Sequence, residues 1–127
     1  MRTCMCVCAC IHTPIYFDLT SQNLTRMVPV LERDIVAAIL RLLRKTPECF
    51  AWKEHGGRYG TAGIPDIIAC FHGKFLAFEV KVPGGKLTKL QELTMQKINN
   101  AKGHAYKVTS AADVAAILQK LEAELDA

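Results

Sequence analysis

Two carboxylates and a lysine occur at a spacing that suits metal-assisted chemistry. A Gly-Ile-Pro-Asp segment at residues 63–66 ends in Asp66, and a later strand-like segment contains Glu79 and Lys81. Successive side chains of a strand point to opposite faces, so Glu79 and Lys81 share one face. If the two segments form a hairpin, Asp66 and Glu79 meet at one end of it. Carboxylates at such close range repel unless a proton or cation lies between them. Mg²⁺, which binds one or two carboxylates together with substrate phosphates, is the natural occupant.

Two further polar residues lie where they could serve the same site. Glu32 precedes Ile35, Val36 and Ile39 by helical spacing, which places it on an apolar stripe where a charge needs a partner. It also begins the helix, where a carboxylate interacts favourably with the helix dipole. Spacing alone leaves both interpretations of Glu32 open. Gln91 lies three residues after Thr88, and this spacing matches a capping box. A purely structural role at the start of a helix would therefore explain Gln91.

The elements that must position these residues follow from periodicity. A helix is predicted over 30–45, with Ile35, Val36, Ile39 and Leu43 on its apolar side, and a strand over 48–54. A polar loop over 55–63 leads to strands two and three, which turn tightly at His72-Gly73.

The second half of the chain is predicted to form a helix, a strand and a helix. The second helix is capped by Thr88, buries Leu90, Leu93 and Ile98, and ends near Gly103. A strand follows over 104–109, and a capping box at Ser110 opens the last helix, whose apolar stripe comprises Val114, Ile117, Leu118, Leu121 and Leu125. The predicted class is α/β in the order αβββαβα. The strand-helix-strand crossover makes strands three and four parallel in a mixed central sheet.

Composition is compatible with one domain and an acidic partner. The chain has 127 residues, half of them hydrophobic, and a net charge of +4. From Lys74 to Lys107 it has seven lysines against two glutamates. That excess suits a polyanion, although a solvated lysine-rich face would give the same composition. No apolar run reaches membrane-spanning length, and we expect no membrane partner.

The cysteines indicate a reducing compartment. Cys4, Cys6, Cys8 and Cys10 lack the C-x₂-C spacing of a zinc site, although thiolates could still bind a soft metal. Cys49 and Cys70 lie in apolar segments and are expected to be small core residues. We therefore expect a cytosolic protein.

Residues 1–26 carry no recognisable chemistry and are expected to be a disordered or non-native extension, with the biological start at Met27 and the domain spanning 27–127.

The combination of these residues resembles the PD-(D/E)xK nuclease superfamily, and more specifically its VRR-NUC family. The family pattern is a glutamate on the first helix, a Gly-x-Pro-Asp turn, a Glu-x-Lys strand and a glutamine on the next helix. Glu32, the segment 63–66, the segment 79–81 and Gln91 match it in order, and the match covers residues 27–120. The loop at 84–88 also resembles the family, whereas residues 1–26 lie outside the resemblance.

The resemblance implies a phosphodiesterase that depends on Mg²⁺ or Mn²⁺. Asp66, Glu79 and the Val80 carbonyl would bind the metal, and Lys81 would orient the attacking water and stabilise developing phosphate charge. Glu32 would hold a metal-bound water, and Gln91 would position Lys81 or the substrate. Basic residues near it are expected to contact DNA: Arg58, Lys86, Lys89 and Lys97.

The resemblance to small stand-alone members, found in phages and bacteria, further implies branched DNA such as four-way junctions as substrate and a homodimer as the working form. A two-fold dimer supplies two symmetric active sites. The first helix and the segment 50–59, with Trp52 as an anchor, are expected dimer surfaces. Two other interpretations remain: a non-catalytic or partner-dependent nucleic-acid-binding module, and a sequence-specific restriction-type nuclease. The latter would have only the loop 55–62 for reading bases.

Overall fold

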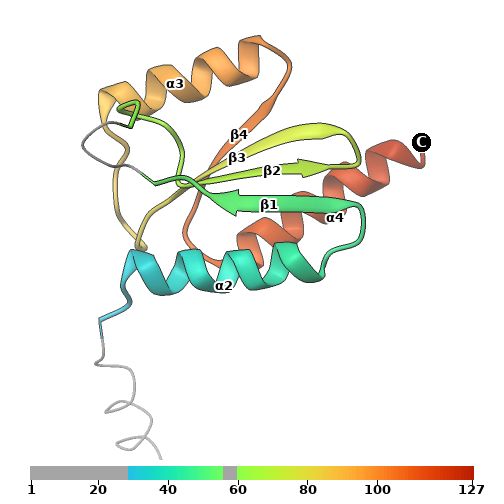
Figure 1. The fold of residues 1–127 in the computed structure, drawn as a ribbon, viewed down its shortest axis with the longest axis horizontal. Helices are drawn as coiled ribbons and strands as arrows, with labels where there is room; N and C mark the ends of the chain where they lie inside the picture. The colour runs from blue at the N-terminus through green and yellow to red at the C-terminus, as the bar shows by residue number, and fades with distance from the viewer. Residues whose placement is uncertain (1–28, 56–59) are drawn as a thin grey trace, which may run out of the picture.

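The computed structural model describes residues 29–55 and 60–127 (Figure 1). Its elements follow the predicted order αβββαβα. They are α2 (Glu32–Lys45), β1 (Cys49–Lys53), β2 (Ile67–Phe71), β3 (Lys74–Val80), α3 (Lys89–Asn100), β4 (His104–Val108) and α4 (Ala111–Leu125). The predicted N-terminal extension with its four cysteines lies outside the described residues, as does the predicted start at Met27.

The strands of the described residues form one mixed sheet in the order β1-β2-β3-β4. The pairs β1–β2 and β2–β3 are antiparallel, and β4 runs parallel to β3. The parallel pair follows from the crossover through α3, as the sequence predicted. The register places Ile67 opposite Phe78, so the residue before β2, Asp66, comes beside Glu79.

Each face of the sheet has its own core. On one face α2 and α4 cover a large cluster that includes Ile39, Leu43, Phe71, Phe78 and Val114. On the other face a small cluster of Ile68, Ala77 and Ala105 lies under Met95 and Ile98 of α3. Figure 1 shows α3 on one side of the sheet and α2 on the other. Because β3 is covered on both faces, Leu76 through Val80 are all buried, and this includes Glu79.

The turn between β2 and β3 forms as predicted. His72 and Gly73 both have positive φ, 49° and 77°. Two consecutive left-handed residues give the turn whose twist matches that of the flanking strands. This fixes the hairpin register and with it the position of Asp66 relative to Glu79.

The apolar face predicted for α3 is confirmed at Ile98, which packs on the sheet, and is wrong at its two leucines. Leu90 and Leu93 are exposed, and the helix instead directs Gln91, Thr94, Met95 and Ile98 inward as half-buried residues. The helix packs on a small cluster of three residues, Ile68 of β2, Ala77 of β3 and Ala105 of β4, so a narrow apolar stripe on the helix is enough to cover it. Leu90 contacts the backbone of Gly63, where an added Cβ would lie 2.6 Å from Leu90 Cγ. The leucines therefore border the covered area rather than form it.

Two smaller expectations also differ from the structure. Cys70 is exposed rather than a core residue, because it alternates with the buried Ala69 and Phe71 and points to the uncovered part of the sheet; Cys49 is half-buried as a partial core residue. Leu125 is exposed at the end of α4, while Val114, Leu118 and Leu121 are buried as predicted. Among the described residues, no helix combines the length and apolarity that a membrane span requires.

Candidate active site

Asp66 is fixed at the entry to β2 by the backbone of β3. Its Oδ2 accepts a hydrogen bond of 2.8 Å from the Val80 N–H, while its own carbonyl accepts one from the Glu54 N–H. Gly63, with φ of 80°, turns the chain so that the buried Pro65 leads directly into Asp66. The Gly-x-Pro-Asp segment thus holds its carboxylate at the end of the hairpin, half-buried and next to Glu79.

Glu79 is the only charged residue that is fully buried among the described residues, with 2% of its surface exposed. Burial and the neighbouring Asp66 carboxylate raise its pKa to about 7, although Lys81 opposes this shift. Its Oε1 accepts a hydrogen bond of 2.5 Å from Gln91 Nε2. Its Oε2 is buried and has no hydrogen-bond partner. A buried carboxylate oxygen without a partner is costly and marks a place for a missing ligand.

Gln91 completes the capping box and also contacts Glu79, rather than Lys81. Its Oε1 accepts the Thr88 N–H at 2.8 Å, and its backbone N–H donates to Thr88 Oγ1 at 3.3 Å, which completes the capping box. Its Nε2 is then left to hold Glu79. The cap of α3 therefore fixes the orientation of an amide that in turn positions a carboxylate of the site.

Lys81 links the carboxylates to the first helix. Its Nζ lies 3.3 Å from Glu79 Oε1 and 3.9 Å from Glu32 Oε1, and only 16% of its side chain is exposed. Glu32 begins α2, adds an acidic group to its first turn, and remains half exposed. It thus meets both descriptions given by its spacing: it complements the helix dipole and has a cationic partner.

The donor set fits a hard divalent cation. Asp66 and Glu79 supply two carboxylates, and the unpartnered Glu79 Oε2 supplies a free oxygen. Within residues 29–55 and 60–127, no three His, Cys, Asp or Glu side chains gather into a closed cage. Mg²⁺ does not need one, because it typically takes one or two carboxylates and completes its shell with water and substrate phosphate.

The sequence analysis missed Lys107, which holds the loop beside the site. Lys107 Nζ donates a hydrogen bond to the Gly85 carbonyl, and the Gly85 N–H donates to the Val82 carbonyl at 2.8 Å. A Cβ on Gly85 would lie 3.2 Å from Lys81 Cβ, so this loop packs against the Lys81 stem. Lys107 pairs with Glu79 across the parallel strands. If the β3–β4 register had been known, the alternation of β4 would have placed Lys107 on the same face as Glu79.

The expected DNA-binding lysines lie around this loop. Lys86 and Lys89 are exposed on either side of the start of α3, and Lys97 is exposed further along the same helix. Lys89 forms an exposed ion pair with Glu92 at 3.7 Å. The fourth expected contact, Arg58, lies outside the described residues.

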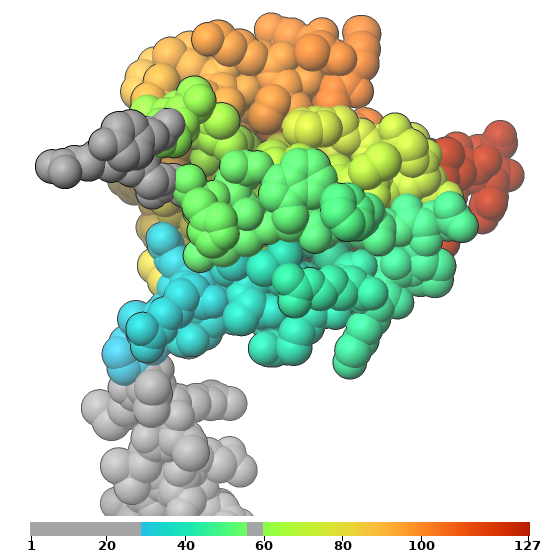
Figure 2. Space-filling view, in the orientation of Figure 1, coloured from blue at the N-terminus to red at the C-terminus, as the bar shows by residue number. Residues whose placement is uncertain are grey.

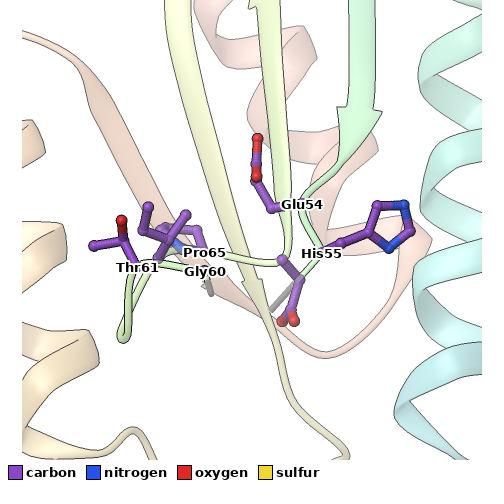
Figure 3. A pocket seen from close by; sticks show the side chains of 7 residues that line it. Glu54, His55, Gly60, Thr61 and Pro65 are labelled. Atoms are coloured by element: carbon purple, nitrogen blue, oxygen red, sulfur yellow. The ribbon is translucent and has the colours of Figure 1, made fainter. Parts of the chain in front are cut away.

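A pocket of about 260 Å³ opens beside Asp66. It is lined by Glu54, His55, Gly60, Thr61, Ile64, Pro65 and Asp66. In Figure 3, Thr61 and Pro65 lie on one side of it, His55 on the opposite side, and Glu54 at the end of β1. The pocket places polar groups and open space next to one of the two carboxylates.

The comparison with solved structures finds this fold. The chain matches a structure described as "VRR_NUC domain protein" with a TM-score of 0.57 and 15% sequence identity. The match covers 71% of this chain and 86% of that one. No family model matches the sequence, and no curated protein matches it. At this identity the likeness concerns the fold, and it agrees with the fold that the sequence pattern predicted.

Proposed function

We propose that this protein is a divalent-metal-dependent nuclease that hydrolyses phosphodiester bonds in DNA. The observation that carries the proposal is the buried, unpartnered Oε2 of Glu79 beside Asp66, with Lys81 3.3 Å from the same carboxylate. This arrangement occurs on the fold of a VRR_NUC domain protein. Carboxylates for a cation and an ammonium group for a phosphate are the two components that this hydrolysis needs.

Asp66 and Glu79, with the Val80 carbonyl as a further ligand, would hold Mg²⁺ or Mn²⁺. When bound, such an ion polarises the phosphoryl group and lowers the pKa of water. The Val80 N–H holds Asp66 in place, and the Gln91 amide does the same for Glu79. Burial and the repulsion between Glu79 and Asp66 raise the Glu79 pKa to about 7, and a bound cation would offset that repulsion.

Lys81 would act on the substrate. Its ammonium group, positioned by Glu79 and Glu32, would orient the attacking water and stabilise the negative charge that grows on the phosphate. Lys86, Lys89 and Lys97 would contact backbone phosphates and hold the DNA without reading its sequence. Arg58 is retained as a fourth such contact from the sequence pattern.

The finer proposal concerns substrate and assembly. We propose that the enzyme prefers branched DNA and works in the cytoplasm as a homodimer, since one domain of this size carries one catalytic set and two opposed cuts require two. The domain is proposed to span residues 27–127.

The experiment that tests the activity uses purified protein with labelled junction, flap, single-stranded and duplex DNA, each with Mg²⁺, Mn²⁺ or a chelator. We expect metal-dependent cleavage that is strongest on branched DNA. Asp66→Asn should abolish it, because the substitution removes a ligand charge with little change in shape. Asp126→Asn, at the exposed end of α4, is the matched control and should cut at the wild-type rate. Cleavage by Asp66→Asn at the wild-type rate would show that the site is misassigned.

A further inference from the structure

The face of the sheet that carries the carboxylates also carries an aromatic pair. Trp52 lies opposite Ile68 on β2, and Ile68 lies opposite Ala77 on β3, so these three share one face. Asp66 precedes Ile68 by two residues and Glu79 follows Ala77 by two, which places both on that face as well. Two residues of a strand span about 7 Å, so Trp52 lies about that far along the strand direction from the Asp66–Glu79 site.

Both rings of the pair are exposed, and a hydrogen bond holds the Trp52 ring. Phe50 is 71% exposed and Trp52 is 41% exposed, with ring centroids 5.8 Å apart. The Trp52 indole N–H donates a hydrogen bond of 2.6 Å to Glu54 Oε1. Glu54 also lines the pocket beside Asp66. Large aromatic rings that are held in place but left uncovered are ready to stack on another flat group.

The opposite border of this face is the flank of α3. Leu90 and Thr94 contact Gly63 at the active-site end, and Ala101 borders a cleft of about 190 Å³ with Phe75, Ile98 and Gly103 at the other end. Lys97 lies on this flank, three residues after Thr94 and four before Ala101. Figure 2 shows β1 and the β2–β3 hairpin at the surface between α2 and α3.

From this arrangement we propose that Phe50 and Trp52 are a stacking platform for unpaired bases next to the cleaved phosphate. The proposal rests on the nuclease function and specifies its substrate as nucleic acid with single-stranded nucleotides at the cut. The phosphate lies at the carboxylates, the neighbouring nucleoside enters the pocket at Glu54, and a base rests on Trp52. Lys97 supplies positive charge for the backbone on the facing wall.

Two observations favour nucleic acid over a protein partner on this face. The aromatic surface is continuous with the proposed catalytic site through Glu54, which both holds Trp52 and lines the pocket. The bordering helix presents a cation, which complements phosphate. Stacking on aromatic side chains is independent of base identity, because every base has a flat face, and it requires bases that are not paired in a duplex.

Trp52 is the single tryptophan of the chain, so its fluorescence reports on the platform directly. Metal-free protein at low salt is titrated with a thymidine oligonucleotide and with an abasic oligonucleotide of equal length and charge. We expect the thymidine strand to quench the emission and the abasic strand to leave it nearly unchanged. Equal responses to both strands would overturn the proposal. So would an emission that shifts with protein concentration alone, because Trp52 would then be covered by a second copy.

Substitutions separate stacking from simple apolar contact. Trp52→Leu keeps an apolar side chain and should weaken binding of the thymidine strand about ten-fold, whereas Trp52→Phe should retain most of it. Leu93→Ala, an exposed apolar residue on the outer side of α3, is the matched control and should bind normally. Retained affinity in Trp52→Leu, with an unchanged melting temperature, contradicts the platform.

Cleavage distinguishes failure of this proposal from failure of the proposed function. Trp52→Leu should lower kcat/KM about ten-fold on DNA with a single-stranded arm at the cut and leave cleavage of continuous duplex unchanged. If wild-type protein cuts no DNA but thymidine still quenches Trp52, the platform stands and the nuclease proposal falls. If wild-type protein cuts and Trp52→Leu cuts both substrates equally well, the platform falls and the nuclease proposal stands.

Discussion

At the scale of single residues, the site depends on how Glu79 is charged. Burial and Asp66 raise its pKa to about 7 from a model-peptide value near 4.5. In the metal-free protein, the folded state therefore keeps a proton that the unfolded chain releases above pH 4.5. Unfolding free energy falls as pH rises from about 4.5 to about 7, since the folded state binds more protons in that window.

The Glu79→Gln variant isolates this effect. Without metal, the unfolding free energy of the wild-type protein should fall by on the order of 2–3 kcal/mol relative to that of Glu79→Gln as pH rises across that window. Urea unfolding in chelator at pH 4.5, 6 and 7.5 measures it, with Glu92→Gln as an exposed control that should follow the wild type. Parallel pH dependences for wild type and Glu79→Gln would contradict the raised pKa. Added Mg²⁺ should raise the unfolding free energy of the wild type more than that of Glu79→Gln at pH 7.5, because only the wild type retains the carboxylate ligand.

Lys81 should affect the chemical step more than DNA affinity. Lys81→Met keeps the length of the side chain but removes the charge that stabilises the transition state, so single-turnover cleavage should fall about 100-fold or more. The Lys81 ammonium lies 3.3 Å from Glu79 Oε1 and lowers the pKa of that carboxyl, so the residual activity should begin at a higher pH. A loss confined to binding affinity would place Lys81 in the DNA-contact surface instead.

At the scale of elements, the start of α3 organises one side of the site. The cap at Thr88 orients Gln91, Gln91 holds Glu79, and the preceding loop packs its Gly85 against Lys81. Lys86 and Lys89 extend from this same stretch into solvent. Because phosphate contacts carry little sequence information, these lysines should bind all DNA shapes alike.

Replacing Lys86 and Lys89 with glutamine should weaken binding to every substrate and flatten its salt dependence. Each lost phosphate contact reduces the slope of log affinity against log salt by roughly 0.9 for duplex DNA. Lys45→Gln with Lys120→Gln is the charge-matched control, since Lys45 ends α2 about 20 Å along the helix from Glu32 and Lys120 lies on α4. Equal salt slopes for the two double variants would exclude this surface.

At the scale of the whole molecule, two cuts require two chains. The described residues contain one set of Asp66, Glu79 and Lys81, so a second, opposed cut would need the same set from a partner subunit. We predict a homodimer that introduces paired nicks in opposed strands of a four-way junction, at the branch point, where the bases next to each cut can leave the duplex stack. Because Trp52 is assigned to nucleic acid, α2 is the surface left from the sequence analysis for pairing.

Sedimentation of the protein, free and on junction DNA, measures the assembly, and product analysis on a supercoiled cruciform shows whether the nicks are paired. Mixing active chains with an excess of Asp66→Asn chains should convert paired cuts into single nicks. A monomer that nicks each strand independently would contradict the junction-resolving assembly while leaving metal-dependent cleavage intact.

The sequence by itself determined the features that depend on near neighbours. The αβββαβα order, the turn at residues 72–73 and the capping boxes follow from local periodicity and side-chain chemistry, which act over a few residues. The same alternation put Glu79 and Lys81 on one face. The Gly-x-Pro-Asp pattern suggested that Asp66 would join them, and the hairpin register brings it there.

Only the tertiary structure decided how far each face of the sheet is covered. Leu90, Leu93 and Cys70 have sequence environments typical of core residues, yet they are exposed because α3 covers only a small cluster on its face of the sheet, Ile68, Ala77 and Ala105. The contact of Lys107 with the Gly85 carbonyl depends on the β3–β4 register, across 22 residues of chain. Trp52 is likewise exposed on the face that carries the carboxylates, because α3 does not extend over β1. Such features are set by the packing of elements that are distant in sequence, and no local pattern encodes that packing.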